Sequence, residues 1–232
     1  MMLLQFWSRL LCLLFGIQIR TDGAAIPSKG PYLIVANHMS YFDIIILGAV
    51  APGIFIAKRP VLYWPVVGLG ALLVGTLFVK RYSKESRAET KSKTIERLHG
   101  GQNIFIFAEG RTNDGTILHP FRYGAFGIAQ QANCPVIPIA VNYSDPQDIS
   151  WDSDTSFFEH IIGLGRKGVI DVRVRISEPM LPTDYPDAKE FSLAAWREIN
   201  GSLVRFGMTS SAGISSVDWS NFFLIAGSSD KQ

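Results

Sequence analysis

A histidine and an aspartate five positions apart, His38 and Asp43, are the residues of this chain best suited to acid–base chemistry. The apolar run at residues 32–35 is typical of a buried strand, and residues 37–40 are expected to turn into a helical segment that begins at Tyr41. With Asp43 one helical turn beyond His38, its carboxylate can hold one ring nitrogen and leave the other free to accept a proton. The spacing alone also fits a capped helix start without catalytic function, so both interpretations stay open at this point.

Three further segments carry residues that can bind a polar substrate. Gly-Thr-Leu-Phe-Val-Lys-Arg at residues 75–81 ends an apolar strand in two cations, and Glu-Gly-Arg-Thr at residues 109–112 follows a strand predicted at 103–108. Pro-Val-Ile-Pro-Ile at residues 135–139 begins another strand. The candidate binding residues that these segments supply are Lys80, Arg81, Glu109, Gly110 and Arg111.

In this order and at these separations, the four segments resemble the glycerolipid acyltransferase family, which includes the 1-acylglycerol-3-phosphate acyltransferases. The family pattern is Asn-His-x4-Asp, then Gly-x-x-Phe-x-x-Arg, then a turn of the Glu-Gly-Thr-Arg type, then a Val-Pro-Ile/Val strand. The resemblance covers residues 23–177, most of the chain, and the joint occurrence of four segments is specific. The third segment departs from the pattern, because it reads Glu-Gly-Arg-Thr, with Arg111 directly after the glycine.

The resemblance implies transfer of an acyl group from a thioester donor, acyl-CoA or acyl carrier protein, to a hydroxyl of a lysophospholipid. We expect His38 to remove the hydroxyl proton and later to protonate the leaving thiolate, and Asp43 to orient His38 and stabilise the imidazolium. A backbone N–H in one of the motif turns is expected to stabilise the oxyanion. A thioester is a good electrophile with a good leaving group, so no covalent nucleophile is required, and the sequence contains no Gly-x-Ser-x-Gly.

An acceptor phosphate needs cations, and Arg81 is the first candidate because a guanidinium binds two phosphate oxygens at once. Further candidate cations are Lys58, Lys80 and Arg111. Lys80 fits a solvated surface position equally well. Glu109, with Gly110 in the same turn, is expected to hold an acceptor hydroxyl or to fix Arg111, and a purely structural role fits as well.

The chain has 232 residues, of which 47% are hydrophobic, and a net charge of +2. This length predicts one domain with a sizeable core, and the near-neutral charge argues against nucleic-acid binding through an extended basic surface. Cys12 and Cys134 lie in different contexts, which predicts no disulfide framework and fits a reducing compartment. No metal-ligand spacing is present, and His99, His119 and His160 are expected to be surface or packing residues. We therefore expect no metal, and no cofactor other than the acyl-CoA or acyl carrier protein co-substrate.

Residues 1–17 are mostly apolar, with a narrow polar stripe at helical spacing that consists of Gln5, Ser8, Arg9, Cys12 and Gly16. The segment is too short and too interrupted for a membrane span, and it lacks the basic start of a signal peptide. We expect an amphipathic helix at the membrane interface, lying in one leaflet with Arg9 at the level of the lipid headgroups. This predicts a membrane-associated enzyme on the cytoplasmic face of the inner membrane.

A second apolar stretch, residues 60–79, carries no charge. Pro65 and three glycines argue against a continuous transmembrane helix in this stretch. The family resemblance implies instead a short helix followed by a strand, both close to the membrane.

The rest of the chain alternates between predicted helices and strands. Helices are expected at residues 84–99, 122–131 and 188–206, and strands at residues 74–79, 136–142 and 171–176. This alternation predicts an α/β fold with a mixed sheet flanked by helices, in which the motif turns gather along one edge. The expected organisation is a membrane-associating helix at 1–20, an acyltransferase domain at 21–207 and a C-terminal tail at 208–232, ordered at most in 219–225.

The expected acceptor is 1-acylglycerol-3-phosphate, which gives phosphatidic acid. The sequence leaves open glycerol 3-phosphate or another lysolipid, such as a lyso-aminolipid, as the acceptor, and it leaves open the donor and the acyl chain length. A thioester or lipid ester hydrolase, in which the same His-Asp pair activates water, is the main competing class. A non-catalytic lipid-binding protein is the third.

Overall fold

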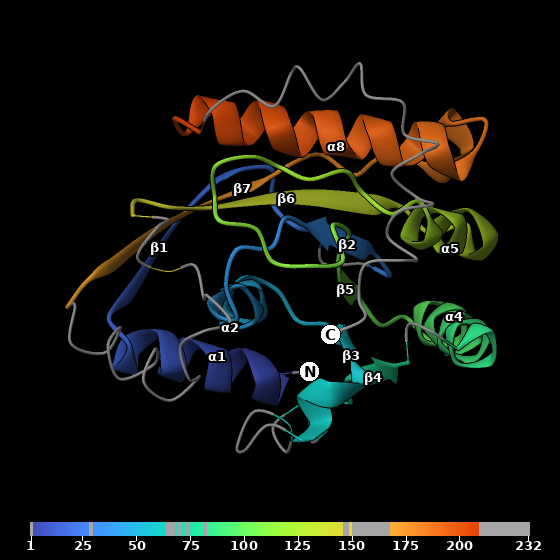
Figure 1. Ribbon diagram of the computed structural model, residues 1–232, viewed down its shortest axis with the longest axis horizontal. Coiled ribbons are helices and arrows are strands. Elements are labelled where there is room, and N and C mark those ends of the chain that lie inside the picture. Colours follow the sequence, from blue (N-terminus) through green and yellow to red (C-terminus); the bar gives the residue numbers. More distant parts are fainter. Residues whose placement is uncertain are drawn as a thin grey trace.

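The structure is a computed structural model that describes residues 2–27, 30–63, 75–80, 83–145 and 168–208, together with positions 68, 71, 72 and 149. In this part of the chain, seven strands form one sheet in the order β1-β7-β6-β2-β5-β3-β4 (Figure 1). The parallel neighbours are β6 (Val136–Tyr143), β2 (Leu33–Ala36), β5 (Ile104–Phe107), β3 (Ile54–Lys58) and β4 (Leu77–Val79). β7 (Ile170–Ile176) runs antiparallel to β6, and β1 (Ile17–Gly23) pairs in parallel with β7 at the edge.

Helices cover both faces of this sheet (Figure 1). α1 (Met2–Leu14) and α2 (Phe42–Val50) pack on one face, and α4 (Lys84–His99), α5 (Gly124–Ala132) and α8 (Ala188–Arg205) pack on the other. Two short 3-10 helices, η1 (Arg59–Tyr63) and η2 (Pro182–Asp184), complete the described elements. The predicted α/β fold, with a mixed sheet flanked by helices, is therefore confirmed.

The central strand β2 contributes to the hydrophobic core on both faces of the sheet. Ile34 and Ala36 join the core beneath α1 and α2, whereas Leu33 and Val35 join the core beneath α5 and α8. All four residues are completely buried, as expected for a central parallel strand. The chain that leaves the carboxyl end of β2 therefore starts from a rigid position in the middle of the sheet.

Most predicted elements agree with the structure to within two residues. α4 spans the predicted residues 84–99; it begins after Ser83, whose hydroxyl accepts a hydrogen bond from the Ser86 N–H, and it ends at Gly100. β1 and β3 are absent from the sequence prediction. β1 is an edge strand that is largely exposed, so it lacks the apolar pattern of a core strand. β3 depends on a partner far along the chain, since Phe55 stacks on Phe105 with ring centroids 4.6 Å apart.

α1 ends at Leu14, and residues 17–20 belong to β1, so the helix is shorter than the predicted segment 1–20. Gly16 stops the helix because it adopts a left-handed conformation with φ of 65°, which favours glycine. A Cβ at this position would also collide with the backbone carbonyl of Gly168.

The polar stripe of α1 contacts α2. Gln5 Nε2 and Arg9 Nε each donate to the Ala49 carbonyl at 3.3 Å, near the carboxyl end of α2, where helix carbonyls lack partners in their own helix. Ser8 is buried against Gly48, at which a Cβ would collide with the serine hydroxyl. Arg9 thus binds α2 while it stays exposed, and its place at the level of the lipid headgroups remains a prediction. The exposed apolar residues of α1 are Phe6, Trp7, Leu13 and Leu14.

Within residues 60–79, the structure shows η1 and β4, in agreement with the implied short helix followed by a strand. In the part of the chain that the structure describes, no helix has both the length and the apolarity needed to cross a membrane. Arg81, His160 and the predicted tail beyond Met208, with its segment 219–225, lie outside the described residues.

Candidate active site

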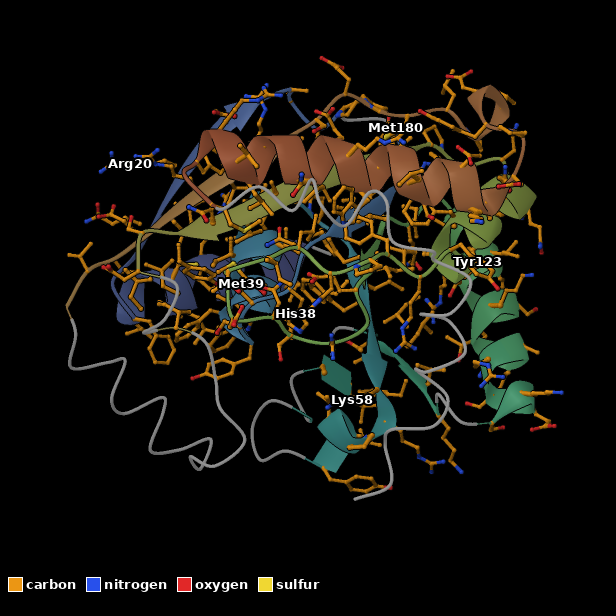
Figure 2. All side chains as sticks on the ribbon, turned by 45° about the horizontal axis from the view of Figure 1, so that its top comes forward. Arg20, His38, Met39, Lys58, Tyr123 and Met180 are labelled. Atoms are coloured by element: carbon orange, nitrogen blue, oxygen red, sulfur yellow. The ribbon has the colours of Figure 1, made fainter. Side chains whose placement is uncertain are left out.

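The carboxyl ends of the parallel strands bring the predicted motifs to one edge of the sheet. His38 follows β2, Glu109 follows β5, Lys58 ends β3 and Lys80 follows β4. These four strands are consecutive neighbours, and Figure 2 shows His38 and Lys58 close to the same edge, well away from Arg20. The carboxyl edge of parallel strands is the usual ligand-binding edge of open α/β sheets. This edge is therefore the candidate active site.

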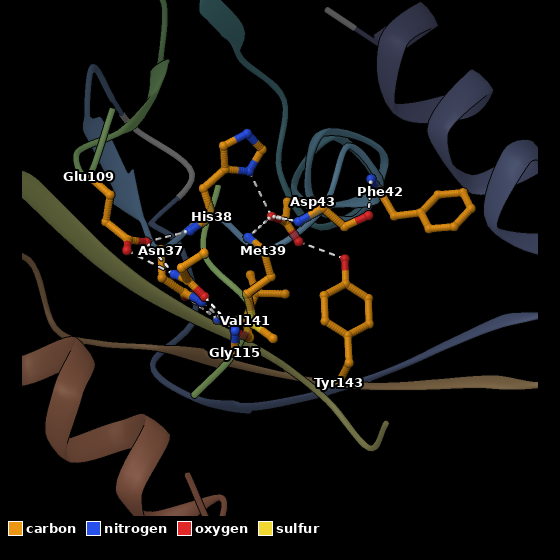
Figure 3. A network of polar contacts seen from close by, with 11 residues as sticks. Asn37, His38, Met39, Phe42, Asp43, Glu109, Gly115, Val141 and Tyr143 are labelled. Carbon is orange, nitrogen blue, oxygen red and sulfur yellow. Dashed lines mark hydrogen bonds and ion pairs between the residues drawn. The ribbon is translucent and has the colours of Figure 1, made fainter. Parts of the chain in front are cut away.

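His38 and Asp43 are in direct contact (Figure 3). His38 Nδ1 lies 2.8 Å from Asp43 Oδ2, and the imidazole stacks on Phe107 with ring centroids 3.9 Å apart and an interplanar angle of 11°. The Asp43 side chain is completely buried, whereas the His38 side chain is 18% exposed. Because a carboxylate can only accept, Nδ1 carries the proton of the neutral ring, and Nε2 is left as the proton acceptor.

The Asp43 carboxylate is fixed by three further hydrogen bonds. Its Oδ2 accepts from the backbone N–H groups of Met39 at 2.7 Å and Ser40 at 2.9 Å, and its Oδ1 accepts from the Tyr143 hydroxyl at 2.6 Å. Burial, with the charge of Asp43, raises the pKa of Tyr143 well above its usual value, so this hydroxyl stays protonated and donates. These bonds compensate the burial of the charge and hold the carboxylate in place before a substrate binds.

Asn37 anchors the start of the turn to the neighbouring strand. Its Nδ2 donates to the Val141 carbonyl at 2.8 Å, and its Oδ1 accepts from the Val141 N–H at 2.8 Å. Backbone pairing between β2 and β6 ends at Ala36 and Ile139, so the Asn37 side chain extends the contact with β6 beyond the last paired residue. The peptide of His38 therefore leaves the sheet at a fixed point.

Glu109 is buried and binds the turn that carries His38. Its Oε1 accepts from the His38 N–H at 2.8 Å, its Oε2 accepts from the His119 N–H at 3.0 Å, and Asn113 Nδ2 donates to both oxygens at 2.9 and 2.8 Å. Burial raises the pKa of Glu109 to about 7, and the hydrogen bonds from Asn113, His38 and His119 act in the opposite direction. Of the roles considered for Glu109, the structural one accounts for these four contacts.

Three consecutive backbone amides in the motif turn are already occupied. The N–H of His38 binds Glu109, and the N–H groups of Met39 and Ser40 bind Asp43. In the second motif turn, the Gly110 N–H donates to the Phe107 carbonyl. The prediction that a motif-turn amide stabilises the oxyanion is therefore wrong for these four amides, because each already has an acceptor within the protein.

Gly110 allows an arginine to lie directly over the Glu-Gly-Arg-Thr turn. Its φ is 75°, in the left-handed region, and a Cβ there would stand 2.6 Å from Arg122 Nε. The Arg122 N–H donates to the Ala108 carbonyl at 2.8 Å, which fixes the base of this side chain. The turn therefore presents a second guanidinium, in addition to that of Arg111, at the carboxyl end of β5.

Arg111 is exposed and contacts the imidazole of His119, with Nη2 at 3.4 Å from Nδ1 and 3.3 Å from Nε2. Burial and the positive charge of Arg111 lower the pKa of His119. The backbone of His119 also binds Glu109 and accepts from Trp196 Nε1 at 3.1 Å. His119 is thus a packing residue, as predicted, and the exposed His99 in the last turn of α4 is a surface residue.

Two of the predicted substrate cations, Lys58 and Lys80, lie at strands beyond β5 in the sheet. Adjacent strands are about 4.8 Å apart, so Lys58, two strands from β2, stands roughly 10 Å to the side of His38, and Lys80, three strands away, roughly 14 Å. Both lysines are exposed, and the Lys80 N–H donates to Ser86 Oγ at the start of α4.

Four residues that shape the site were missed by sequence reasoning about side-chain chemistry: Asn37, Phe107, Asn113 and Tyr143. Asn37 is the first residue of the Asn-His-x4-Asp motif, Phe107 lies two residues before Glu109, and Tyr143 ends a strand predicted to lie in the same sheet. Their position at the carboxyl ends of strands was therefore an available signal for three of them. Asn113 lies in a loop, and its contact with Glu109 has no counterpart in a sequence pattern.

Comparisons with known proteins agree on the family. The family model described as Acyltransferase matches residues 18–142, more than half of the chain. A lyso-ornithine lipid O-acyltransferase from Brucella abortus (strain 2308) is 36% identical over 201 residues, which cover 79% of this chain and 75% of the relative. The 1-acyl-sn-glycerol-3-phosphate acyltransferase alpha from Homo sapiens is 32% identical over 198 residues, which cover 81% of this chain and 66% of the relative.

The fold also has a solved counterpart. The crystal structure of the 1-acyl-sn-glycerophosphate (LPA) acyltransferase PlsC from Thermotoga maritima superimposes with a TM-score of 0.70, at 21% identity, and covers 90% of this chain and 80% of that chain. The likeness at this identity concerns the fold, and the sequence matches concern the family. On the family model and the relatives together, the chain belongs to the acyltransferase family.

Proposed function

We propose that this protein transfers a fatty acyl group from a thioester donor to the hydroxyl of a lysolipid, with His38 as the general base. The observation that carries the proposal is the contact of His38 Nδ1 with the buried Asp43 carboxylate at 2.8 Å. This contact leaves Nε2 to accept a proton at the carboxyl edge of the sheet.

In the proposed reaction, Nε2 of His38 removes the acceptor hydroxyl proton while the hydroxyl oxygen forms a bond to the thioester carbon. The tetrahedral intermediate then expels the thiolate, and the imidazolium returns the proton to the sulfur. Asp43 stabilises the imidazolium between the two steps and keeps Nδ1 protonated. The products are an ester and a free thiol, with no covalent acyl-enzyme.

Two acceptors are consistent with the relatives, and we place lyso-ornithine lipid before 1-acylglycerol-3-phosphate. A relative named for the first acceptor is 36% identical and is covered over 75% of its length. Relatives named for the second are 32% identical and covered over 66%, or 38% identical and covered over only 44%. Both acceptors carry an anionic group, a carboxylate or a phosphate. Arg81, whose guanidinium can bind two oxygens at once, remains our first candidate to bind it, and Lys58, Lys80 and Arg111 are the others.

We further propose that α1 holds the enzyme on the membrane. Its four exposed apolar residues point away from α2, and the exposed Tyr63 of η1 is a further aromatic residue beside the site strands. An amphipathic helix with such a face lies in the interface plane of a bilayer. Acyl-CoA and acyl carrier protein are cytoplasmic donors, which places the enzyme on the cytoplasmic side of the membrane.

The test is an acceptor panel with purified protein and two donors, acyl-CoA and acyl carrier protein. The acceptors are lyso-ornithine lipid, 1-acylglycerol-3-phosphate, glycerol 3-phosphate and none. We expect acylated product only when a lysolipid is present, and a rate about 10²–10⁴ lower for His38→Ala. If free fatty acid is released at the same rate with and without an acceptor, the protein is a hydrolase instead. Turnover of His38→Ala near that of the wild type would exclude the mechanism.

A further inference from the structure

The peptide of His38 is held on both sides by one loop. Its N–H donates to Glu109 Oε1, and its carbonyl accepts from the Asn113 N–H at 2.8 Å. Both partners belong to the segment that follows β5, in a different part of the sequence from the His-Asp motif. The orientation of the imidazole thus depends on how this loop is held.

The loop is itself held by the side chain of Asn113, which is buried. Asn113 Oδ1 accepts from the Gly115 N–H at 2.8 Å, so the amide oxygen has a backbone donor and the opposite nitrogen must face Glu109. That nitrogen donates to both carboxylate oxygens of Glu109. The carboxylate is therefore clamped between the Asn113 amide and the backbone N–H groups of His38 and His119.

We propose that Asn113 is a positioning residue for catalysis: its side-chain amide orients the Glu109 carboxylate, which in turn fixes the peptide of His38. The proposal rests on the proposed role of His38 as general base. Asn113 acts through Glu109 and His38 and does not touch the substrate itself. Its loss should therefore slow the chemical step and leave substrate binding unchanged. A displacement of about 1 Å in a catalytic group can cost up to 10²-fold in rate.

Asn103 provides a matched control at the other end of β5. It is as buried as Asn113, at 8% exposure for both. It also bridges two backbone groups, since its Oδ1 accepts from the Tyr32 N–H at 3.0 Å and its Nδ2 donates to the Pro52 carbonyl at 2.9 Å. It lies before the amino end of its strand, away from His38. Its replacement tests what the loss of a buried bridging asparagine does to the fold alone.

The experiment compares Asn113→Ala and Asn103→Ala with the wild type, using the acceptor and donor that the panel identifies. We expect Asn113→Ala to lower kcat about 10- to 100-fold with both KM values within about twofold of the wild type. Asn103→Ala should lower the stability to urea comparably and keep kcat within about twofold. Equal kcat in the two variants would overturn the proposal. So would a loss of catalytic efficiency in Asn113→Ala that comes from a higher acceptor KM, because Asn113 would then contact the substrate.

A third variant, Asn113→Asp, tests whether the N–H donor matters rather than the shape. It keeps the oxygen that accepts from the Gly115 N–H but places a second carboxyl group against that of Glu109. The other ionisable groups near this pair are Asp43, His38, His119, Arg111 and Arg122. As the pH falls from about 8 to about 6, a proton shared by the two carboxyls can replace the missing donor. We expect the kcat ratio of this variant to the wild type to rise over this range, and a flat ratio would contradict the donor role.

A readout independent of turnover separates this proposal from the proposed function. The amide proton of His38 should move upfield in the NMR spectrum of Asn113→Ala, because its hydrogen bond to Glu109 lengthens, and it should not move in Asn103→Ala. An unmoved resonance in Asn113→Ala would overturn the positioning role even if no lysolipid is acylated. If the wild type transfers no acyl group but the His38 amide proton shifts as expected in Asn113→Ala, only the proposed function is overturned.

Discussion

At the scale of single residues, the site is a set of side chains whose hydrogen-bonding groups are already occupied before substrate arrives. Asp43 accepts four hydrogen bonds and Glu109 accepts four, all from donors within the protein. Two buried carboxylates are thus satisfied on either side of the His38 turn. His38 contacts Asp43 through Nδ1, and Nε2 is the atom that we propose accepts the proton.

Replacing Asp43 by asparagine should reduce catalysis while preserving the fold. The amide oxygen can still accept from the Met39 and Ser40 N–H groups, but the imidazolium formed in the reaction loses its counter-charge. We expect kcat to fall by about 10²–10⁴ with little change in acceptor KM. Steady-state kinetics together with circular dichroism of Asp43→Asn measures both effects. A main effect on acceptor KM would show that Asp43 serves binding instead.

Gly110→Ala should destabilise the Glu-Gly-Arg-Thr turn. The left-handed φ of 75° and the contact with Arg122 both oppose a Cβ, and we expect a loss of about 1–2 kcal/mol in the free energy of unfolding. Gly124→Ala is the control, since no atom lies within 4 Å of a Cβ there, and it should be neutral or stabilise by about 0.4–1 kcal/mol. Urea unfolding of both variants checks the difference, and equal stabilities would contradict the strain argument.

At the scale of secondary-structure elements, α1 both docks on a neighbouring helix and presents the apolar face for which we propose a membrane contact. Its polar stripe docks on α2, the helix that carries Asp43, and four of its apolar residues are exposed. Deletion of the whole segment would uncover the core through the buried Cys12 and remove part of β1. The membrane role therefore has to be tested on the exposed face alone.

We expect the combined variant Phe6→Ser, Trp7→Gln, Leu13→Gln and Leu14→Gln to leave vesicles and enter the soluble fraction. These side chains are 51–77% exposed, so the free energy of unfolding should change little. The control is Leu181→Gln with Val204→Gln, two exposed apolar residues near α8, on the other face of the sheet. Vesicle sedimentation measures the partition. Full sedimentation of the α1 variant would place the membrane contact elsewhere, for example near η1.

At the scale of the whole molecule, the buried Glu109 links the stability of the fold to pH. Burial raises the pKa of Glu109 to about 7, whereas an unfolded glutamate titrates near about 4.3. At a pH between these two pKa values, the folded protein keeps a proton on Glu109 that the unfolded chain has lost. The stability that this group contributes is therefore complete below about pH 4.3 and is lost as the pH rises through about 7, by roughly 3 kcal/mol.

The measurement is the free energy of unfolding between about pH 4.5 and pH 8 for the wild type and Glu109→Gln. Glutamine has no ionisable group, so the difference between the two curves should fall with rising pH and level off above about pH 7. Titrating groups that do not interact with Glu109 contribute equally to both proteins and cancel in this difference. Parallel curves would show that Glu109 titrates alike in the folded and unfolded chains.

The sequence by itself determined the fold class, most element boundaries and the His-Asp pair. α4 could be predicted because Ser83 and Gly100 mark its two ends locally, and β2 could be predicted because its four residues are all apolar. His38 and Asp43 could be paired because their spacing places them across a single turn. Each of these inferences uses information that lies within a few residues along the chain.

Only the tertiary structure decided what lies around that pair. Tyr143 is 100 residues from Asp43, Asn37 is 104 residues from Val141, and Glu109 is 71 residues from His38. The docking of α1 also depended on packing, because the sequence gives no sign that its polar stripe contacts Gly48 and Ala49 of α2. Contacts of this kind arise when strands pair and helices pack, and no local pattern encodes them.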